Sequence, residues 1–203
     1  LPAHFRYTRD TMKIEALGIP EVKLLTPVKH QDSRGFFIES YNCQAFAKLG
    51  IGVDFVQDNH SLSIPKGTLR GLHFQAPPFA QTKLVHCTRG SILDVAVDIR
   101  AGSPTYGHAV TVMLNAITMQ MLLVPEGFAH GFCTLEDNTE VQYKVNAGYS
   151  AECDGGVAWD DPALGIDWPV TGIEVLLSDK DKTHPTLEPV SYTHLTLPTI
   201  CSV

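Results

Sequence analysis

The sequence predicts an all-β fold, a sandwich or barrel of short strands, and three observations support this prediction. Apolar and polar residues alternate with a period of two through most of the chain, whereas helical spacing is convincing only at residues 43–49. The alternating segments are short and evenly spaced, as in sandwiches and barrels. Turn sequences such as Arg89-Gly90, Pro125-Glu126-Gly127 and Asp137-Asn138 separate them.

Each expected element follows from this pattern. We expect strands at residues 22–26, 36–41, 53–57, 68–75, 83–87, 91–99, 108–114, 119–124, 129–135 and 140–145. Gly50 is placed to end the single helix at 43–49.

Three further expectations concern the middle and the end of the chain. The strands at 83–87 and 91–99, joined at Arg89-Gly90, read as a hairpin. Residues 91–99 alternate so regularly that one face should be buried and the other wet or functional. Residues 146–169 are rich in Gly, Asp and Pro and should form a long loop.

The bulk properties indicate one globular domain. The chain has 203 residues, 44% of them hydrophobic and 18% charged. The net charge of -7 argues against a general nucleic-acid or anionic-membrane surface, but it permits a local basic pocket. No apolar run approaches the roughly 20 residues of a membrane span. We expect residues 12–190 to form the domain, with residues 1–11 a non-native or disordered leader and residues 191–203 a similar tail.

The cysteines indicate a reducing compartment. Their number is five, which is odd, they are widely spaced, and no CxxC pair is present. Reduced thiols in the cytoplasm are therefore the simplest interpretation.

The most informative stretch is GTLRGLHFQ, residues 67–75. It places Arg70 and His73 in a buried strand that Gly67 and Gly71 interrupt. Side chains three residues apart on a regular strand face opposite ways. If Arg70 and His73 share a pocket, a bulge at Gly71 is therefore required. The alternative is a histidine packed in the sheet and an arginine on its outer face.

Two more side chains are candidates for chemistry. Tyr143 is in phase with Val141 and Val145, so its ring should point to the interior, either as a core ring or as a functional phenol. Lys83 is in phase with Val85 and Cys87, and an inward lysine is costly unless it is paired or used. The alternative for Lys83 is a charge on an edge strand.

A metal site is a weaker interpretation. The metal-binding cupins carry G-x5-H-x-H with a following Glu, and P-x-G-x2-H-x3-N. This sequence resembles them at Gly67, His73 and His130, but Gln75 replaces the second histidine and no glutamate follows within a few residues. Open transition-metal sites usually have about three protein ligands. We therefore expect no bound metal.

Without a metal, an inward histidine, lysine and tyrosine suggest proton transfer. Neutral imidazole is a suitable base near neutral pH when a carboxylate holds its tautomer. Spacing alone does not choose that carboxylate among Asp94, Asp98, Asp160, Asp161, Asp179 and Asp181.

Many short motifs, taken together, resemble the dTDP-4-dehydrorhamnose 3,5-epimerase family, from about residue 12 to residue 189. They include RGFFIESY (34–41), FVQDNHS (55–61), LRGLHFQ (69–75), KLVHC (83–87), VPEGFAHGF (124–132), WDDPALGIDWP (159–169) and SDKD (178–181). The resemblance implies a cupin-type jelly roll with a few short helices that works as a homodimer without metal or organic cofactor. It also implies epimerisation of dTDP-4-dehydro-6-deoxy-D-glucose at carbons 3 and 5, in dTDP-rhamnose biosynthesis.

The resemblance assigns roles residue by residue. His73 would be the base, Asp181 the carboxylate that orients it, Tyr143 the acid on the opposite face of the sugar, and Lys83 the cation near the ketone oxygen. Substrate-binding positions would be Arg34, Glu39, Gln57, Asp58, Asn59, Arg70, His130, Asp154 and Lys180.

Two other functions stay open on the sequence alone. A relative could epimerise one carbon only, or act on another 4-keto nucleotide sugar. A non-catalytic sugar-binding cupin would tolerate the loss of His73 and Tyr143.

Overall fold

The computed structural model describes residues 11–187. The expected tail, and all of the expected leader except Thr11, lie outside these residues and stay expectations. Within the described residues, no helix is long and apolar enough to cross a membrane.

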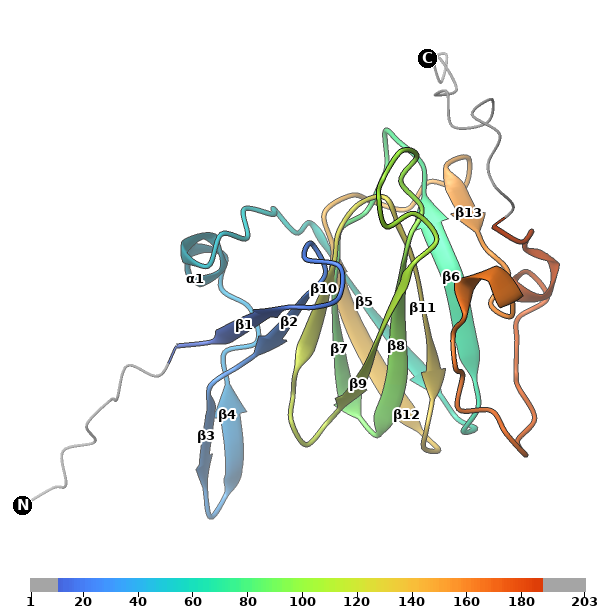
Figure 1. Ribbon diagram of the computed structural model, residues 1–203. Coiled ribbons are helices and arrows are strands. Elements are labelled where there is room, and N and C mark those ends of the chain that lie inside the picture. The colour runs from blue at the N-terminus through green and yellow to red at the C-terminus, as the bar shows by residue number, and fades with distance from the viewer. Residues whose placement is uncertain (1–10, 188–203) are drawn as a thin grey trace, which may run out of the picture.

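Two antiparallel sheets pack face to face as a jelly roll, which confirms the all-β prediction (Figure 1). In the described residues, the first sheet has the order β1 (Lys13–Ala16), β2 (Lys23–Thr26), β10 (Met121–Val124), β7 (Lys83–Arg89), β12 (Thr139–Val145) and β5 (Gln57–Ser63). The second sheet has the order β13 (Asp154–Gly156), β6 (Leu69–Gln75), β11 (Phe128–Thr134), β8 (Ser91–Asp98) and β9 (Ala109–Asn115). A separate hairpin, β3 (Lys29–Asp32) with β4 (Gly35–Ile38), projects from the sandwich.

The short helices are α1 (Cys43–Lys48), η1 (Pro162–Leu164) and η2 (Asp181–Thr183). Asn42 caps α1, since its side chain accepts hydrogen bonds from the backbone N–H groups of Gln44 and Ala45. Gly50 follows with a φ of 78°, so the helix ends where the sequence predicts.

The expected hairpin of residues 83–87 and 91–99 is wrong. Strand β7 pairs with β10 and β12 in the first sheet, whereas β8 pairs with β11 and β9 in the second. The turn at Arg89-Gly90 therefore carries the chain from one sheet to the other. Gly90 has a φ of 74°, and a Cβ there would lie 2.5 Å from Thr139 Oγ1, so this crossing requires glycine.

Several strand boundaries also differ from expectation. Strand β5 begins at Gln57, where the expected strand 53–57 ends, and β1 and β3 were not expected. Val53 and Phe55 instead pack with Phe46 over the outer face of the first sheet, so their alternation reflects the packing of an irregular segment. The expected strand 36–41 ends at Ile38.

Both faces of β8 are buried, so the face expected to be wet or functional is not wet, although its Asp94 is bound to the His130 side chain. Ile92 and Ala96 belong to the core between the sheets. Val95 and Val97 face the other way and pack against side chains from the segment after β13. Residues 146–169 are largely irregular, as expected, apart from β13 and η1. Together with the residues that follow, they cover the outer face of the second sheet with apolar side chains, including Val157, Leu164 and Trp168.

Candidate active site

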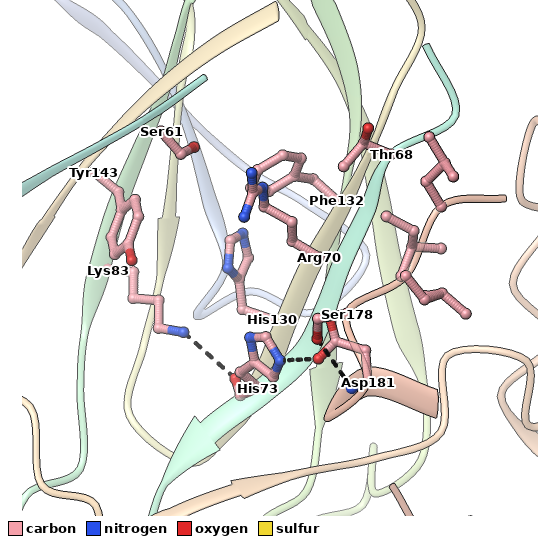
Figure 2. Close-up of a pocket in the computed structure, with 13 residues that line it drawn as sticks. Ser61, Thr68, Arg70, His73, Lys83, His130, Phe132, Tyr143, Ser178 and Asp181 are labelled. Atoms are coloured by element: carbon pink, nitrogen blue, oxygen red, sulfur yellow. Dashed lines mark hydrogen bonds and ion pairs between the residues drawn. The ribbon is translucent and has the colours of Figure 1, made fainter. Parts of the chain in front are cut away.

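A cavity of about 440 Å³ opens between the two sheets (Figure 2). Its lining residues are Ser61, Thr68, Leu69, Arg70, His73, Lys83, His130, Phe132, Tyr143, Leu176, Leu177, Ser178 and Asp181. All four side chains that the sequence analysis selected as catalytic, and two of those selected for binding, therefore line one cavity.

A β-bulge at Gly71 brings Arg70 and His73 to the same cavity, as predicted. On β11, His130 pairs with His73 and Phe132 with Arg70, so two residue steps oppose three on β6. Gly71 has a φ of 132°, and a Cβ there would lie 2.5 Å from the Cα of Gly131. Only glycine allows the two strands to approach this closely.

Among the candidate carboxylates, Asp181 is the one bound to His73. The distance from His73 Nε2 to Asp181 Oδ1 is 2.5 Å, and the Asp181 side chain is 3% exposed. Two backbone hydrogen bonds, from Leu176 N to Gly67 O and from Leu69 N to Leu176 O, fix the C-terminal segment beside β6. This attachment delivers Asp181 to a histidine 108 residues earlier in the chain.

The pair leaves His73 with the properties of a base. An ionised Asp181 holds the ring proton on Nε2, so the lone pair is on Nδ1, which points into the cavity (Figure 2). Burial lowers the pKa of His73 below the ordinary imidazole value, although the hydrogen bond and charge of Asp181 act in the opposite direction. His73 is therefore neutral at pH 7.

Lys83 lies inside the sandwich rather than on an edge, because β7 has β10 and β12 on either side. Its residue exposure is 8%, and its ammonium group donates to the backbone oxygen of His73 over 3.4 Å. Burial lowers the pKa of Lys83 to about 8, while the charges of Asp94 and Asp154 act in the opposite direction.

Tyr143 enters the cavity from the sheet opposite His73. It belongs to β12 of the first sheet, whereas His73 belongs to β6 of the second (Figure 2). Burial raises the pKa of its phenol above the ordinary value of 10, so the hydroxyl keeps its proton at neutral pH.

Arg70 and His130 complete the polar lining. Arg70 donates from Nε to Ser63 Oγ and from Nη2 to the Leu62 carbonyl, at 3.1 and 3.3 Å. His130 Nε2 lies 2.7 Å from Asp94 Oδ1, and both side chains are buried. Asp94 was one of several open candidates to orient the base, and the structure pairs it with the other histidine.

The remaining predicted binding residues lie outside this lining. Gln57 and Asn59 are hydrogen-bonded to each other at 2.8 Å on the same face of β5 as Ser61, whereas Asp58 is on the opposite face and pairs with Lys144.

The other four predicted binding residues lie outside β5, two before it in the chain and two after it. Arg34 is 88% exposed on the β3–β4 hairpin and pairs with Asp32, and Glu39 accepts a hydrogen bond from Asn42. Asp154 and Lys180 form an ion pair beside the C-terminal segment.

Sequence reasoning missed several lining residues. Ser178 lies in the SDKD motif, and its hydroxyl accepts a hydrogen bond from the backbone of Asp181. Phe132 is in phase with His130 on β11, so its direction could have been inferred, whereas Ser61 lies on β5 beyond the end of the expected strand. Leu176 and Leu177 come from an irregular segment, where no periodicity could indicate their direction.

The weaker metal interpretation joined His73 with His130. These residues are cross-strand partners, but His130 is bound by Asp94 and His73 by Asp181. Within residues 11–187, the group of three donors close enough to hold one ion is His73, Asp181 and His184, without His130. The cupin metal motif therefore does not assemble on the two histidines that suggested it.

Comparison with known proteins decides the family. The model of the dTDP-4-dehydrorhamnose 3,5-epimerase family matches residues 16–189. The chain belongs to this family. A family member from Sinorhizobium fredii is 53% identical over 188 residues, which cover 92% of this chain and 96% of the relative.

Solved structures of similar enzymes share the fold. One is a dTDP-6-deoxy-D-glucose-3,5-epimerase from Legionella pneumophila in complex with dTDP-4-keto-L-rhamnose, with 43% identity, a TM-score of 0.83, and coverage of 86% of this chain and 92% of that one. Another is ChmJ, a 3′-monoepimerase from Streptomyces bikiniensis in complex with dTDP-quinovose, with 37% identity, a TM-score of 0.78, and coverage of 84% and 85%.

Proposed function

We propose that this enzyme converts dTDP-4-dehydro-6-deoxy-D-glucose to dTDP-4-dehydro-L-rhamnose by inverting carbons 3 and 5, in dTDP-rhamnose biosynthesis. The observation that carries the proposal is that His73 and Tyr143 line one cavity from opposite sheets. Inversion needs a group that removes a proton from one face of the sugar and another that returns one to the other face. The family and the epimerase bound to dTDP-4-keto-L-rhamnose support this choice of substrate.

The chemistry begins at the proton next to the ketone. The Nδ1 lone pair of His73 takes this proton, and the adjacent Asp181 carboxylate stabilises the imidazolium that forms. The ammonium group of Lys83 stabilises the negative charge that develops on the ketone oxygen. Because Lys83 is buried, this interaction is much stronger than it would be in water.

Tyr143 then donates its hydroxyl proton to the opposite face of the carbon. After one inversion His73 carries an extra proton and Tyr143 lacks one, so both must exchange with solvent before the next cycle. This exchange lets solvent hydrogen enter the product at each inverted carbon.

The remaining polar residues serve binding in this proposal. Arg70 presents guanidinium N–H donors to the diphosphate. The planar guanidinium group holds paired N–H donors in a geometry that suits phosphate oxygens. His130, fixed by Asp94, contacts the sugar or diphosphate. Asp154 and Lys180 contact substrate beside the base, and Gln57 and Asn59, which share a face of β5 with Ser61, extend the binding site along that strand. Asp58, on the other face of β5, has no role in this cavity.

We also propose that the enzyme is a homodimer. The β3–β4 hairpin makes no strand pairing with either main sheet, and its Phe36 and Phe37 are 48% and 67% exposed. A second copy that covers this hairpin would bury both rings. Arg34 and Glu39, which lie near the hairpin, would then act at the partner's cavity.

Analytical ultracentrifugation tests the assembly. We expect a dimer for the wild type and a shift towards monomer for Phe36→Ser with Phe37→Ser. A fully active wild-type monomer would contradict the homodimer.

The four cysteines of the described chain are free, which supports a reducing compartment such as the cytoplasm.

The decisive test of the reaction is solvent deuterium incorporation. The enzyme is incubated in D2O with dTDP-4-dehydro-6-deoxy-D-glucose, and the recovered sugar is analysed by NMR. We expect deuterium at both carbon 3 and carbon 5. Deuterium at a single carbon would indicate a mono-epimerase, as ChmJ is described. No deuterium at either carbon would indicate a binding protein.

A further inference from the structure

The side chains of His73, Asp181 and His184 converge on one point beside the cavity. His184 Nε2 is buried there and makes no hydrogen bond among the described residues. It lies 3.5 Å from Asp181 Oδ1, the same oxygen that His73 Nε2 approaches to 2.5 Å. The three donor atoms lie within 4.8 Å of one another, and the two imidazole rings meet edge to face.

The surrounding backbone makes room for this arrangement. Gly156 on β13 stands directly opposite His73 on β6. A Cβ at Gly156 would lie 2.4 Å from His184 Nε2, so the missing side chain leaves the space that the His184 ring occupies. His184 follows Asp181 by one turn of η2, and its side chain is only 9% exposed.

An unpartnered nitrogen in this position is costly, and it points to a ligand. A buried polar atom that makes no hydrogen bond loses its interaction with water and gains nothing in return. His184 therefore presents an unused nitrogen to a carboxylate and to a second imidazole. Two imidazole nitrogens and one carboxylate oxygen are a donor set that first-row transition ions prefer.

We propose that His73, Asp181 and His184 bind a divalent transition ion, with Zn²⁺ as the probe, and that the bound ion inhibits the enzyme. The inhibitory part of this inference rests on the proposed role of His73 as base. Zinc–nitrogen and zinc–oxygen bonds are about 2.0–2.2 Å, so donors sharing an ion lie up to about 4 Å apart. The observed separations come close to this limit before any ion draws the side chains together.

The inhibition follows from the tautomer of His73. Neutral imidazole carries one proton, which the Asp181 hydrogen bond places on Nε2. An ion that takes the Nε2 lone pair leaves this proton on Nδ1, the nitrogen that faces the substrate. No net proton is gained or lost, yet the base no longer has a lone pair for the sugar.

The test measures binding and turnover separately on the full chain, freed of metal by chelation. Isothermal titration with ZnCl2 should show one site per chain in the wild type. His184→Phe keeps a flat ring over Gly156 but removes both nitrogens. We expect it to weaken this site by more than about 10- to 100-fold, the loss that even an outer-shell change causes. His184→Asn, a second variant, should do the same.

Turnover gives the complementary result. Zn²⁺ should inhibit the wild type, and EDTA should restore it. Metal-free His184→Phe should turn over like the wild type and resist Zn²⁺ at the concentrations that inhibit it. His108→Asn removes an exposed histidine and should behave as the wild type in both measurements.

Two results would overturn the proposal. Equal Zn²⁺ affinity in the wild type and in His184→Phe would indicate an adventitious ion only. Equal inhibition of both proteins would place the inhibitory ion elsewhere, for example on the exposed Cys43 thiol. Because titration requires no turnover, failure of the metal site is distinguishable from failure of the proposed epimerase function.

Discussion

His73 and His130 are direct cross-strand partners on β6 and β11, yet each is bound by a different carboxylate. Asp181 reaches His73 from the C-terminal segment, and Asp94 reaches His130 from β8. The His73 side chain is 33% exposed, whereas that of His130 is 7% exposed. Two neighbouring imidazoles are thus fixed by two separate carboxylates.

The first prediction contrasts these two histidines. His73→Asn should lower kcat by about 10²–10⁴-fold, because general base catalysis contributes this much. Deuterium exchange should disappear at both carbons. His130→Asn should mainly raise KM and leave exchange detectable at saturating substrate. Steady-state kinetics with NMR detection of exchange measures both, and retained exchange in His73→Asn would remove His73 from its role.

The second prediction concerns Asp181. Its carboxylate raises the pKa of His73, so Asp181→Asn should lower that pKa further. The base must be neutral, so activity is lost as the pH falls through this pKa. The acidic limb of the kcat/KM profile should therefore move to lower pH. The plateau value of kcat/KM should fall by roughly 10²-fold, within the range of general base catalysis, because the imidazolium of His73 loses the carboxylate that stabilises it.

A purely structural role for Asp181 would lower the plateau without moving this limb. The pH profile of kcat/KM, measured for wild type and variant in the same buffers, separates the two cases. An unchanged acidic limb would contradict the orienting role.

The third prediction concerns the opposite face of the sugar. Tyr143→Phe removes the donor but leaves His73 and Asp181 in place. Proton removal and return by His73 should continue, so deuterium should enter the substrate with retained configuration. The inverted product should fall by about 10²–10⁴-fold. NMR of the recovered sugars distinguishes retention from inversion, and normal inversion would exclude the phenol as the acid.

The fourth prediction concerns alkaline pH. The pKa of Lys83 is lowered to about 8, so the ammonium group loses its proton as the pH rises through this value. Stabilisation of the enolate is then lost, and kcat should show an alkaline limb near pH 8. Lys83→Met should lack this limb and should lose about 10²–10³-fold in kcat, as when one oxyanion donor is removed. A limb that persists in the variant would belong to another group.

The fifth prediction concerns the bulge. Gly71→Ala places a Cβ 2.5 Å from Gly131 and should destabilise the fold by about 2–4 kcal/mol, through backbone strain and overpacking. Gly35 has the same φ of 132° but open space around it, which makes Gly35→Ala the matched control for strain alone. Denaturant unfolding should show a clearly larger loss for Gly71→Ala. Equal losses would mean that the close approach to β11 has no energetic role.

Local sequence patterns were sufficient to predict most strands of the two sheets and the helix α1, but not β1, β3 or β13. Alternation reports which face of a strand is buried, and Gly50 marks the end of the helix locally. Alternation does not report which strands are neighbours, so β7 and β8 were wrongly paired across Gly90. It also fails in residues 53–56, where an irregular segment packs apolar side chains on a sheet.

The site could be predicted in part for the same reason. The inward positions of Tyr143 and Lys83 follow from the strand period, and the bulge follows from Gly71. The partner of His73 could not be derived from spacing, since Asp181 is 108 residues away, at the start of the short helix η2. That contact depends on the hydrogen bonds between Leu176 and residues 67–69, a tertiary feature with no sequence period.

The attachment at Leu176 has a consequence for biosynthesis. A nascent chain that has emerged only to residue 175 already contains every strand of both sheets, together with His73, Lys83 and Tyr143. It lacks the carboxylate that sets the imidazole tautomer, which arrives only with residues 176–181. A sandwich assembled from the emerged strands would therefore hold His73 without its orienting carboxylate until residues 176–181 leave the ribosome.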